Sequence, residues 1–214
     1  MKRERQVFLD KVEEYVPLRE AEVLEIGCGS GYQSAEIAVR CRSLIGIDPS
    51  DEKLILAKQL PVPNASFVKG TAERLPFEDR RFNAVFFTLS FHHVPAENMS
   101  EAINEALRVL KENGSIIFLE PGTKGNFFEA EIFFDAGDGD ETREKATAYE
   151  AMMAHPRLEP VAEIPDETRF LKVSPEAFMR TLWPKKNLDQ LKTFLSDHGF
   201  SLWAERRINI FMPK

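Results

Sequence analysis

The chain has few cysteines, no long apolar run and no cluster of basic residues, and each scarcity argues against a class of protein. Two cysteines in 214 residues, Cys28 and Cys41, are too few for a disulfide framework, so we expect a reduced, cytoplasmic protein. No apolar run of signal-peptide length follows the charged N-terminus, and no segment has the composition of a membrane span. Lys and Arg are scattered and the net charge is -7. This argues against a nucleic-acid partner, because proteins that bind nucleic acid need a basic face.

Short apolar runs alternate with amphipathic segments through residues 23–121, and this order predicts an α/β fold. Strands are expected at residues 23–26, 44–48, 66–69, 82–89 and 115–120. Helices are expected at residues 32–40, 50–60 and 97–111, the last of them ending at Asn113-Gly114. Continuous apolar strands joined by helices indicate a parallel sheet that is covered on both faces.

The remainder of the chain has a weaker pattern, and we expect one domain over residues 1–214 in four parts. Residues 1–20 form an N-terminal helix, with helical spacing of apolar residues between Gln6 and Val16. Residues 21–121 are the core, residues 122–186 a cover over the substrate side, and residues 187–214 a helix and a final strand. That strand, residues 200–212, is expected to be antiparallel at a sheet edge. The sixth strand is either residues 169–173 or the first half of this final run.

The first expected strand ends in a glycine-rich turn, Gly27-Cys28-Gly29-Ser30-Gly31. The three glycines remove three Cβ atoms where the backbone bends sharply and where a ligand comes close. The pattern is G-x-G-x-G, which differs from the G-x-G-x-x-G of dinucleotide-binding turns. For the glycines taken alone, a tight strand-to-helix turn without a ligand is the alternative.

Polar residues follow the next expected strands at the same edge, where parallel α/β sheets bind their ligands. Asp48 closes the second strand, and an acid there can accept both hydroxyl groups of a ribose. Thr71 and Ala72 follow the third strand, where backbone amides can contact an adenine edge. Thr88 and Leu89 end the fourth strand beside the glycine turn.

Together these segments resemble the class I S-adenosylmethionine-dependent methyltransferases, and more narrowly the small-molecule group that includes the ubiquinone/menaquinone-type enzymes. The matching text is VLEIGCGSGYQSAEIA, LIGIDPSDEKLILAK, GTAERLPFEDRRFNAVFFTLSFHHV and EALRVLKENGSIIFLEP. The resemblance implies a Rossmann-like doubly wound, mostly parallel sheet with an antiparallel C-terminal edge strand and a helical cover over the substrate side. It also implies S-adenosyl-L-methionine as cofactor, S-adenosyl-L-homocysteine as product and a small-molecule acceptor.

The resemblance also assigns roles to single positions. The implied cofactor-binding residues are Glu25, Gly27, Cys28, Gly29, Gly31, Asp48, Pro49, Thr71, Ala72, Thr88 and Leu89. The turn approaches the methionine part, Glu25 steadies the turn and the ammonium, and Asp48 binds the ribose. Many relatives have an acid at Thr71, so the adenine contact is weaker or different here. Many also have Phe-Asp at Phe82-Asn83, a departure from which we expect only a structural effect.

His92-His93 follows the fourth expected strand at the mouth of the cleft and is the candidate general base. A structural role is the alternative, because a histidine pair here is common in the resembling group across different substrates. Adjacent histidines cannot easily bind one metal ion. The aspartates of residues 135–140 lack the spacing of a calcium loop, so we expect a solvated acidic loop and no metal.

The expected acceptor is small and at least partly apolar. The cover contains aromatic and methionine residues that either line its pocket or form a small core of their own: Phe127, Phe128, Phe133, Phe134, Tyr149, Met152, Met153 and Trp183. Two other functions compete with methyl transfer. One is an NAD-type oxidoreductase on the same sheet topology, which the glycine spacing disfavours. The other is a non-catalytic or regulatory protein that keeps the cofactor pocket. The acceptor, the methylated atom and the oligomeric state stay open.

Overall fold

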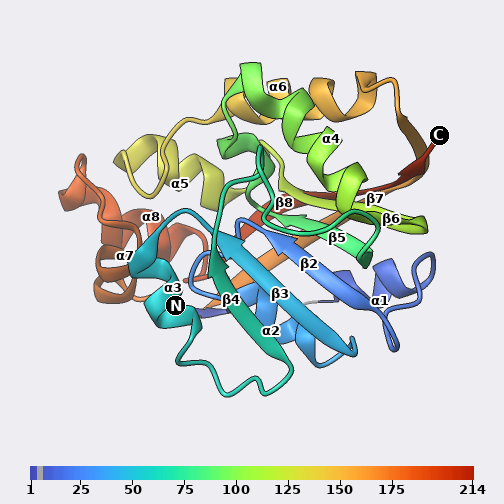
Figure 1. Ribbon diagram of the computed structural model, residues 1–214. Coiled ribbons are helices and arrows are strands. Elements are labelled where there is room, and N and C mark those ends of the chain that lie inside the picture. Colours follow the sequence, from blue (N-terminus) through green and yellow to red (C-terminus); the bar gives the residue numbers. More distant parts are fainter. Residues whose placement is uncertain (4–6) are drawn as a thin grey trace.

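The computed structural model describes residues 1–3 and 7–214, and these residues build one eight-stranded sheet with helices on both faces (Figure 1). The strands are β1 (Lys2–Arg3), β2 (Glu22–Ile26), β3 (Ser43–Asp48), β4 (Ala65–Lys69), β5 (Phe82–Thr88), β6 (Leu110–Pro121), β7 (Leu158–Leu171) and β8 (Leu202–Pro213). The α-helices are α1 (Phe8–Glu13), α2 (Tyr32–Ala38), α3 (Asp51–Ala57), α4 (Met99–Val109), α5 (Asn126–Phe134), α6 (Thr142–Ala154), α7 (Pro175–Leu182) and α8 (Leu191–Asp197). Short 3-10 helices are η1 (Phe91–His93), η2 (Ala96–Asn98) and η3 (Leu188–Gln190).

The strand order is β1-β7-β8-β6-β5-β2-β3-β4, and strands β2 to β6 run parallel to their neighbours within this group. Strand β2 lies between β3 and β5, so the chain order reverses beside it. The carboxyl ends of β2, β3, β4 and β5 therefore meet at one edge. Open α/β sheets bind ligands at such a reversal, and the glycine turn directly follows β2.

Each face of the sheet has its own apolar core, because the interior strands are buried on both sides. Successive residues of β5 point to opposite faces: Phe87 packs with Ile103 under α4 and α6, whereas Phe86 packs with Phe8. In Figure 1, α4 and α6 lie above the sheet, and residues of α1, α2 and α3 belong to the core on the opposite face. This two-sided burial is why β5 reads as a continuous apolar run in the sequence.

Helix ends follow local sequence signals where a side chain makes the cap. The hydroxyl of Ser50 accepts a bond from the backbone of Lys53 at the start of α3, and Ser174 caps α7, which begins at Pro175. Helix α1 falls within the predicted N-terminal helix, although Gln6 lies outside the described residues. Helix α4 ends at Val109 and not at Asn113-Gly114, because the chain enters β6 at the next residue.

The predicted fold class is confirmed, but the position of the last strand differs from the prediction. Strand β8 is antiparallel as expected, yet it lies inside the sheet between β6 and β7. The sixth strand of the prediction corresponds to β7, which begins well before residue 169. Pro160 and Pro165 hid this strand from the sequence pattern. They are tolerated because, among the described residues, β7 has only the two-residue β1 on its other side, where few ladder bonds are lost.

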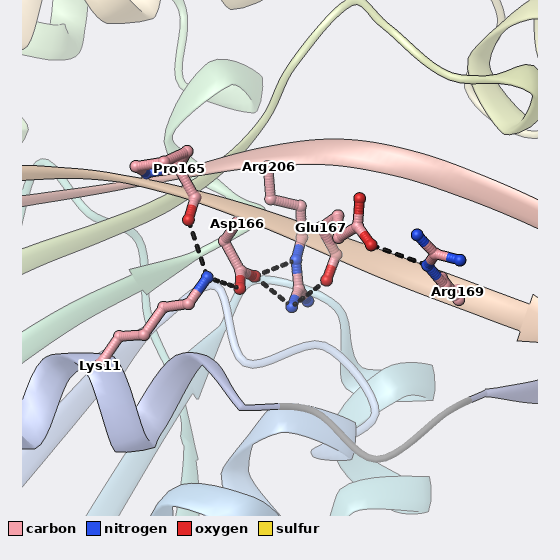
Figure 2. A network of polar contacts seen from close by, with 6 residues as sticks. All are labelled: Lys11, Pro165, Asp166, Glu167, Arg169 and Arg206. Carbon is pink, nitrogen blue, oxygen red and sulfur yellow. Dashed lines mark hydrogen bonds and ion pairs between the residues drawn. The ribbon is translucent and has the colours of Figure 1, made fainter.

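A buried ion-pair network joins these two antiparallel strands to the first helix (Figure 2). Asp166 on β7 lies opposite Arg206 on β8, and its Oδ2 atom accepts bonds from Nε of Arg206 at 2.8 Å and from Nη2 at 2.5 Å. Lys11 on α1 reaches Oδ1 of the same carboxylate at 2.9 Å. The side chains of Asp166 and Arg206 are 1% and 2% exposed, so the network anchors α1 to the β7–β8 side of the sheet.

The predicted cover is only partly helical, since β7 belongs to the main sheet. Helices α5, α7 and α8 gather at one end of the molecule, at the left in Figure 1, around a third apolar cluster that includes Phe134 and Phe178. Among the cover aromatics, Phe127 and Phe133 pack onto this cluster or its rings, whereas Trp183 is 73% exposed. Within the described part of the chain, no helix combines the length and apolar character of a bilayer span.

Candidate active site

The turn between β2 and α2 requires glycine at three positions. Gly27, Gly29 and Gly31 have φ angles of +74°, +55° and +80°, a region that other residues rarely adopt. A Cβ atom on Gly27 would lie 2.4 Å from Cβ of Ser90, and one on Gly31 would lie 2.5 Å from a leucine side chain. A Cβ atom on Gly29 would be 3.9 Å from Cδ of Lys53, its nearest contact among the described residues. The backbone at Gly29 is therefore the part of the turn that a ligand can approach.

Asp48, the last residue of β3, holds this turn in place. Its Oδ2 atom accepts a bond from the backbone amide of Gly29 at 2.8 Å, and Oδ1 accepts one from the amide of Ser50 at 2.9 Å. The amide of Cys28 donates to the carbonyl of Ile47 at 2.9 Å. The end of β3 thus fixes the conformation of the turn that follows β2, and Asp48 remains only 5% exposed.

Glu25 is fully buried behind the turn. It accepts hydrogen bonds from Oγ of Ser34 and, at 2.5 Å, from Oγ1 of Thr88. Burial raises the pKa of Glu25 to about 7, the two hydroxyl groups oppose the rise, and the charge of Asp48 adds to it. The carboxyl group therefore ties β2, α2 and β5 together from below, and it has no face on the cavity described next.

A cavity of about 880 Å³ opens at the carboxyl ends of β2, β3, β4 and β5, within the range of roughly 300–1,000 Å³ that small-molecule sites occupy. Its wall contains nine of the predicted cofactor residues: Gly27, Cys28, Gly29, Asp48, Pro49, Thr71, Ala72, Thr88 and Leu89. Glu25 and Gly31 support the turn from behind. Further wall residues that the sequence did not predict include Tyr32, Gln33, Lys53, Glu73, Phe87 and Asp138.

The end of β5 carries a strained residue at the cavity wall. Leu89 has a φ angle of +54° although it is not glycine, and such conformations concentrate at functional sites. Two bonds hold it there: its amide donates to the carbonyl of Leu119 at 2.7 Å, and Oγ of the following Ser90 donates to the carbonyl of Ile26 at 2.7 Å. The chain is thereby forced to turn from β5 into η1 beside the glycine turn.

The two histidines of η1 occupy different environments. His93 is on the cavity wall with its side chain 49% exposed, whereas His92 is 4% exposed and points away from it toward Glu120. Burial and the neighbouring charge of His92 lower the pKa of His93, against the opposing carboxylates of Glu141 and Asp138. Burial also disfavours protonation of His92, but the carboxylates of Glu120 and Glu141 outweigh it, so its pKa is raised.

Glu120 is a site residue that the strand pattern did not reveal. It is the penultimate residue of β6, and its carboxylate accepts bonds from the backbone amides of Ser90, Phe91 and His92 at 3.0, 3.0 and 3.2 Å. The matching text ends in Leu119-Glu120-Pro121, so an acid at the carboxyl end of a buried strand was the available signal. One carboxylate therefore sets the backbone of η1 and the ring of His92.

Comparison with known proteins shows which family the core of the sheet is similar to. Residues 24–118 match the sequence profile described as a methyltransferase domain. This part of the chain is therefore similar to a methyltransferase domain. The predicted resemblance is confirmed, and the matched residues include β2 except for its first two positions, all of β3, β4 and β5, and the glycine turn.

Named methyltransferases are similar to this chain over part of their own length. The demethylmenaquinone methyltransferase of Chlorobaculum tepidum is 34% identical over 104 residues, which are 48% of this chain and 42% of that protein. The uncharacterized methyltransferase YcgJ of Bacillus subtilis is 29% identical over 130 residues, 56% of this chain and 51% of the relative. The chain thus spans about half the length of the curated relatives it matches.

Solved structures extend the likeness to nearly the whole chain. A putative methyltransferase from Bacillus halodurans superposes with a TM-score of 0.59, covering 95% of this chain and 97% of that one. The identity is 20%, so this likeness shows a common fold. It includes the antiparallel strands that the family profile leaves out.

A further glycine, in β3, makes room for the turn. A Cβ atom on Gly46 of β3 would lie 2.9 Å from Sγ of Cys28 and 2.8 Å from Phe67. The thiol of Cys28 therefore packs against bare backbone, and its burial raises the pKa of the thiol. Both Cys28 and Cys41 are free cysteines.

Proposed function

We propose that this chain is an S-adenosylmethionine-dependent methyltransferase that moves a methyl group to a small acceptor. One observation carries the proposal: the carboxyl ends of four parallel strands surround a cavity with a glycine turn and Asp48 on its wall. The family match over residues 24–118 supports the same activity. The names of the relatives support it as well, although they describe proteins of which the chain spans about half.

The wall of the cavity has the charge that a cationic adenosyl compound requires. Its carboxylates belong to Asp48, Glu73 and Asp138, and Lys53 is the ammonium group among the described wall residues. This excess of negative charge favours a sulfonium and an ammonium group and disfavours the pyrophosphate of a dinucleotide. In this proposal Asp48 binds the ribose hydroxyls, and the open backbone at Gly29 faces the methionine part.

The adenine is assigned to the far end of the same wall. Pro49 offers an apolar surface to a ring, and the backbone of Thr71 and Ala72 offers hydrogen-bonding groups to its edge. Thr71 has no carboxylate for the exocyclic amine, so we expect a weaker contact there than in relatives with an acid. Glu25 acts through the turn, because it is buried behind it.

S-adenosylmethionine, when bound, supplies a methyl group that its positive sulfur already activates. The chain has to hold the acceptor in line with that group, which is the larger part of the rate enhancement in such displacements. An acceptor that must lose a proton needs a base within hydrogen-bond reach. His93 is our candidate, because it is on the cavity wall and a lowered pKa keeps its ring neutral near pH 7. His92 is assigned a positioning role.

The acceptor is proposed to be small and partly apolar. Apolar side chains line the cavity near His93, namely Phe87, Leu89, Val94 and Pro95. The cover aromatics do not supply this surface: Phe134 belongs to the third apolar cluster and Trp183 faces solvent. The acceptor's size is therefore argued from the strand ends and the loop after η1. A cytoplasmic location and a single domain over residues 1–214 remain predictions.

The proposal is tested by calorimetric titration of the purified chain with S-adenosylmethionine, S-adenosylhomocysteine and NAD. We expect binding of both adenosyl compounds and none of NAD. Asp48→Ala should weaken the binding of the adenosyl compounds roughly 10- to 100-fold, since it removes a charged hydrogen-bond partner. Asp51→Ala, one helix turn away and 69% exposed on its side chain, is the matched control and should bind as the wild type does. Equal affinity of the two variants, or preference for NAD, would overturn the proposal.

Transfer itself is measured with methyl-labelled cofactor and a panel of phenols, quinols, thiols and small amines. Labelled product from at least one apolar member supports the enzyme. Cofactor binding without product across the whole panel would instead favour the regulatory alternative. Activity confined to highly charged acceptors would contradict the proposed apolar character.

A further inference from the structure

Next to the cofactor cavity, three side chains converge in a way that methyl transfer does not require. The Nε2 atom of His92 lies 3.6 Å from Oε2 of Glu141, and Nδ1 of His93 lies 3.4 Å from Oε1 of the same carboxylate. One ligand atom from each residue lies within 4.8 Å of the other two. We propose that His92, His93 and Glu141 bind a zinc ion. Ligand atoms around a tetrahedral zinc lie roughly 3.3 Å apart, given bonds of about 2.0–2.1 Å. The two histidine–carboxylate distances are close to this value, and the other separations, which are within 4.8 Å, contract when the ion binds.

The ring of His92 is already oriented as a zinc ligand. Its Nδ1 atom lies 2.5 Å from Oε2 of Glu120, and a carboxylate that accepts the proton of one ring nitrogen leaves the other nitrogen with its lone pair free. Histidine ligands of metals almost always have such a partner, which fixes the tautomer and strengthens the ligand. Here Nε2 points at Glu141. Glu120 is itself fixed by three backbone amides, so the whole arrangement is rigid.

Adjacent histidines rarely share one ion because their side chains leave the backbone at different places. In η1 this difference is offset, since His92 presents its distant nitrogen Nε2 and His93 its near nitrogen Nδ1. The 3-10 turn brings the ring centroids to 4.1 Å with a tilt of 42°. Both rings therefore reach the same carboxylate, and the sequence argument against a shared ion does not hold for this geometry.

The third ligand comes from the cover. Glu141 immediately precedes α6, but its carboxylate makes no capping bond and turns to the histidines instead. Its side chain is 15% exposed. Glu120 and Glu131 lie in the same electrostatic neighbourhood, and the ammonium of Lys145 is the nearby permanent positive charge. Burial raises the pKa of Glu131 to about 8, so its carboxyl group is largely protonated at neutral pH. Glu120 and Glu141 against one ammonium then leave about one negative charge, which favours a bound cation.

Lys145 is the competitor of the metal. Its ammonium lies 3.7 Å from Oε2 of Glu141 and 4.2 Å from the centroid of the Phe128 ring, and its side chain is 7% exposed. A zinc ion has to share the Glu141 carboxylate with it or displace it toward Glu131. This competition gives a second prediction. Removing a ligand should lower the affinity for zinc, whereas removing the charge of Lys145 should raise it.

The ligand set fits zinc better than magnesium or calcium, which prefer oxygen ligands. Two imidazoles and one carboxylate with an open fourth position are the donors of catalytic zinc sites. His93 also lines the cofactor cavity, so the ion lies at its wall. A role for the ion in holding an acceptor oxygen or sulfur rests on the proposed function, and in the zinc-bound chain it replaces the role of His93 as base. The binding of zinc itself does not rest on that function.

The test uses the full chain, stripped with a chelator and titrated with Zn²⁺ alone by calorimetry and with Co²⁺ by absorption spectroscopy. We expect one ion per chain, and a tetrahedral cobalt spectrum without the thiolate band that Cys28 or Cys41 would give. His92→Ala, His93→Ala and Glu141→Gln should each weaken binding at least about tenfold. The control is His198→Ala, which should bind zinc as the wild type does. His198 follows α8, and its ring contacts the backbone carbonyl of Phe194.

The Lys145→Met variant distinguishes a zinc site from a group of carboxylates and imidazoles that only form hydrogen bonds with one another. It keeps the stem over Phe128 and removes the competing charge, so zinc affinity should rise about tenfold or more. Unchanged affinity in this variant, no stoichiometric ion, or equal binding by the histidine variants overturns the proposal. The affinity of the stripped chain for S-adenosylhomocysteine distinguishes the two hypotheses. If the chain binds S-adenosylhomocysteine but not zinc, the methyltransferase proposal stands and the zinc-site proposal is wrong. Circular dichroism verifies that each variant is folded.

Discussion

The Nδ1 atom of His92 lies 2.5 Å from Oε2 of Glu120, and this pair couples the end of β6 to the loop that follows β5. The position of the carboxylate is fixed, because it also accepts hydrogen bonds from three consecutive backbone amides that begin at Ser90. Both partners are buried. The raised pKa of His92 follows from the carboxylates overcoming the effect of burial. A histidine with a raised pKa makes its full contribution to stability at pH values below its pKa in the unfolded chain. The contribution is lost as the pH rises through its pKa in the folded chain.

Removing this carboxylate should therefore cost much more than the loss of one ion pair. Glu120→Ala leaves three backbone amides without their acceptor, and we expect a loss of about 3 kcal/mol or more in the free energy of unfolding. Glu120→Gln keeps an acceptor oxygen and should lose less, but the pKa of His92 should fall. Urea unfolding measures the first effect and an NMR titration of the ring the second.

The matched control is Glu112→Ala, on an exposed part of the same strand, which should change stability by less than about 0.5 kcal/mol. Similar losses for the two alanine variants, or an unchanged His92 titration in Glu120→Gln, would show that the carboxylate does not organise the loop.

The glycine turn permits a second comparison, between two glycines that differ in surroundings. Gly27→Ala combines a positive φ with a Cβ contact of 2.4 Å to Ser90, so we expect a loss of about 3 kcal/mol in stability. Gly29→Ala has a positive φ but open space, so we expect about 1 kcal/mol. Its larger effect should fall on cofactor affinity, because the added methyl group faces the ligand.

Thermal or urea unfolding ranks the stabilities, and titration with S-adenosylhomocysteine ranks the affinities. The order of the two variants should reverse between the two measurements after correction for the folded fraction. If the same variant were the more impaired in both stability and affinity, Gly29 would not be the side of the turn that faces the ligand.

The sequence predicted the parallel core well because each of its elements carries a local signal. Apolar runs locate β2 to β6, and Ser50 and Ser174 mark helix starts by their own side chains. The wall residues after each strand followed from topology, since parallel strands end at one edge. Asn83 illustrates the expected structural effect: its Oδ1 atom accepts bonds from the amide of Glu22 and from Lys111, both at 3.0 Å.

The parts that were not predicted depend on contacts distant in the chain. Strand β7 contains two prolines, and its place outside β8 is set by pairing with residues about forty positions away, as Asp166 and Arg206 show. The division of labour between His92 and His93 depends on Glu120 and Glu141, which belong to other elements. No local periodicity encodes which of two adjacent rings turns inward.

The buried pair between β7 and β8 gives a third prediction. Asp166→Ala removes the partner that lies opposite the nearly inaccessible Arg206, and we expect a loss of about 3–5 kcal/mol. Lys11→Met removes the third member, whose side chain is 31% exposed, and should cost less than about 1 kcal/mol. Both values come from urea unfolding at neutral pH. Similar costs for the two variants would contradict the view that the Asp166–Arg206 pair dominates the network.

The last prediction concerns the pH dependence that Glu25 imposes. Its pKa is about 7 in the folded chain and near 4.5 when unfolded, so between these values the folded state holds the extra proton. Stability from this group is therefore greatest at low pH and is lost as the pH rises from about 4.5 to 7, by roughly 3 kcal/mol in all. Glu25→Gln cannot ionise, so relative to the wild type it should gain that amount across the same window and stay level above it.

Urea unfolding of both proteins at pH 5, 6, 7 and 8 measures the difference directly, and subtraction removes the titration of groups that the two share. Glu52→Gln, exposed in the first turn of α3, is the control and should show no such trend. The gain arises because burial penalises the carboxylate more than the hydroxyls of Ser34 and Thr88 stabilise it. A difference between wild type and Glu25→Gln that is constant with pH would mean that these two hydroxyls compensate the burial in full.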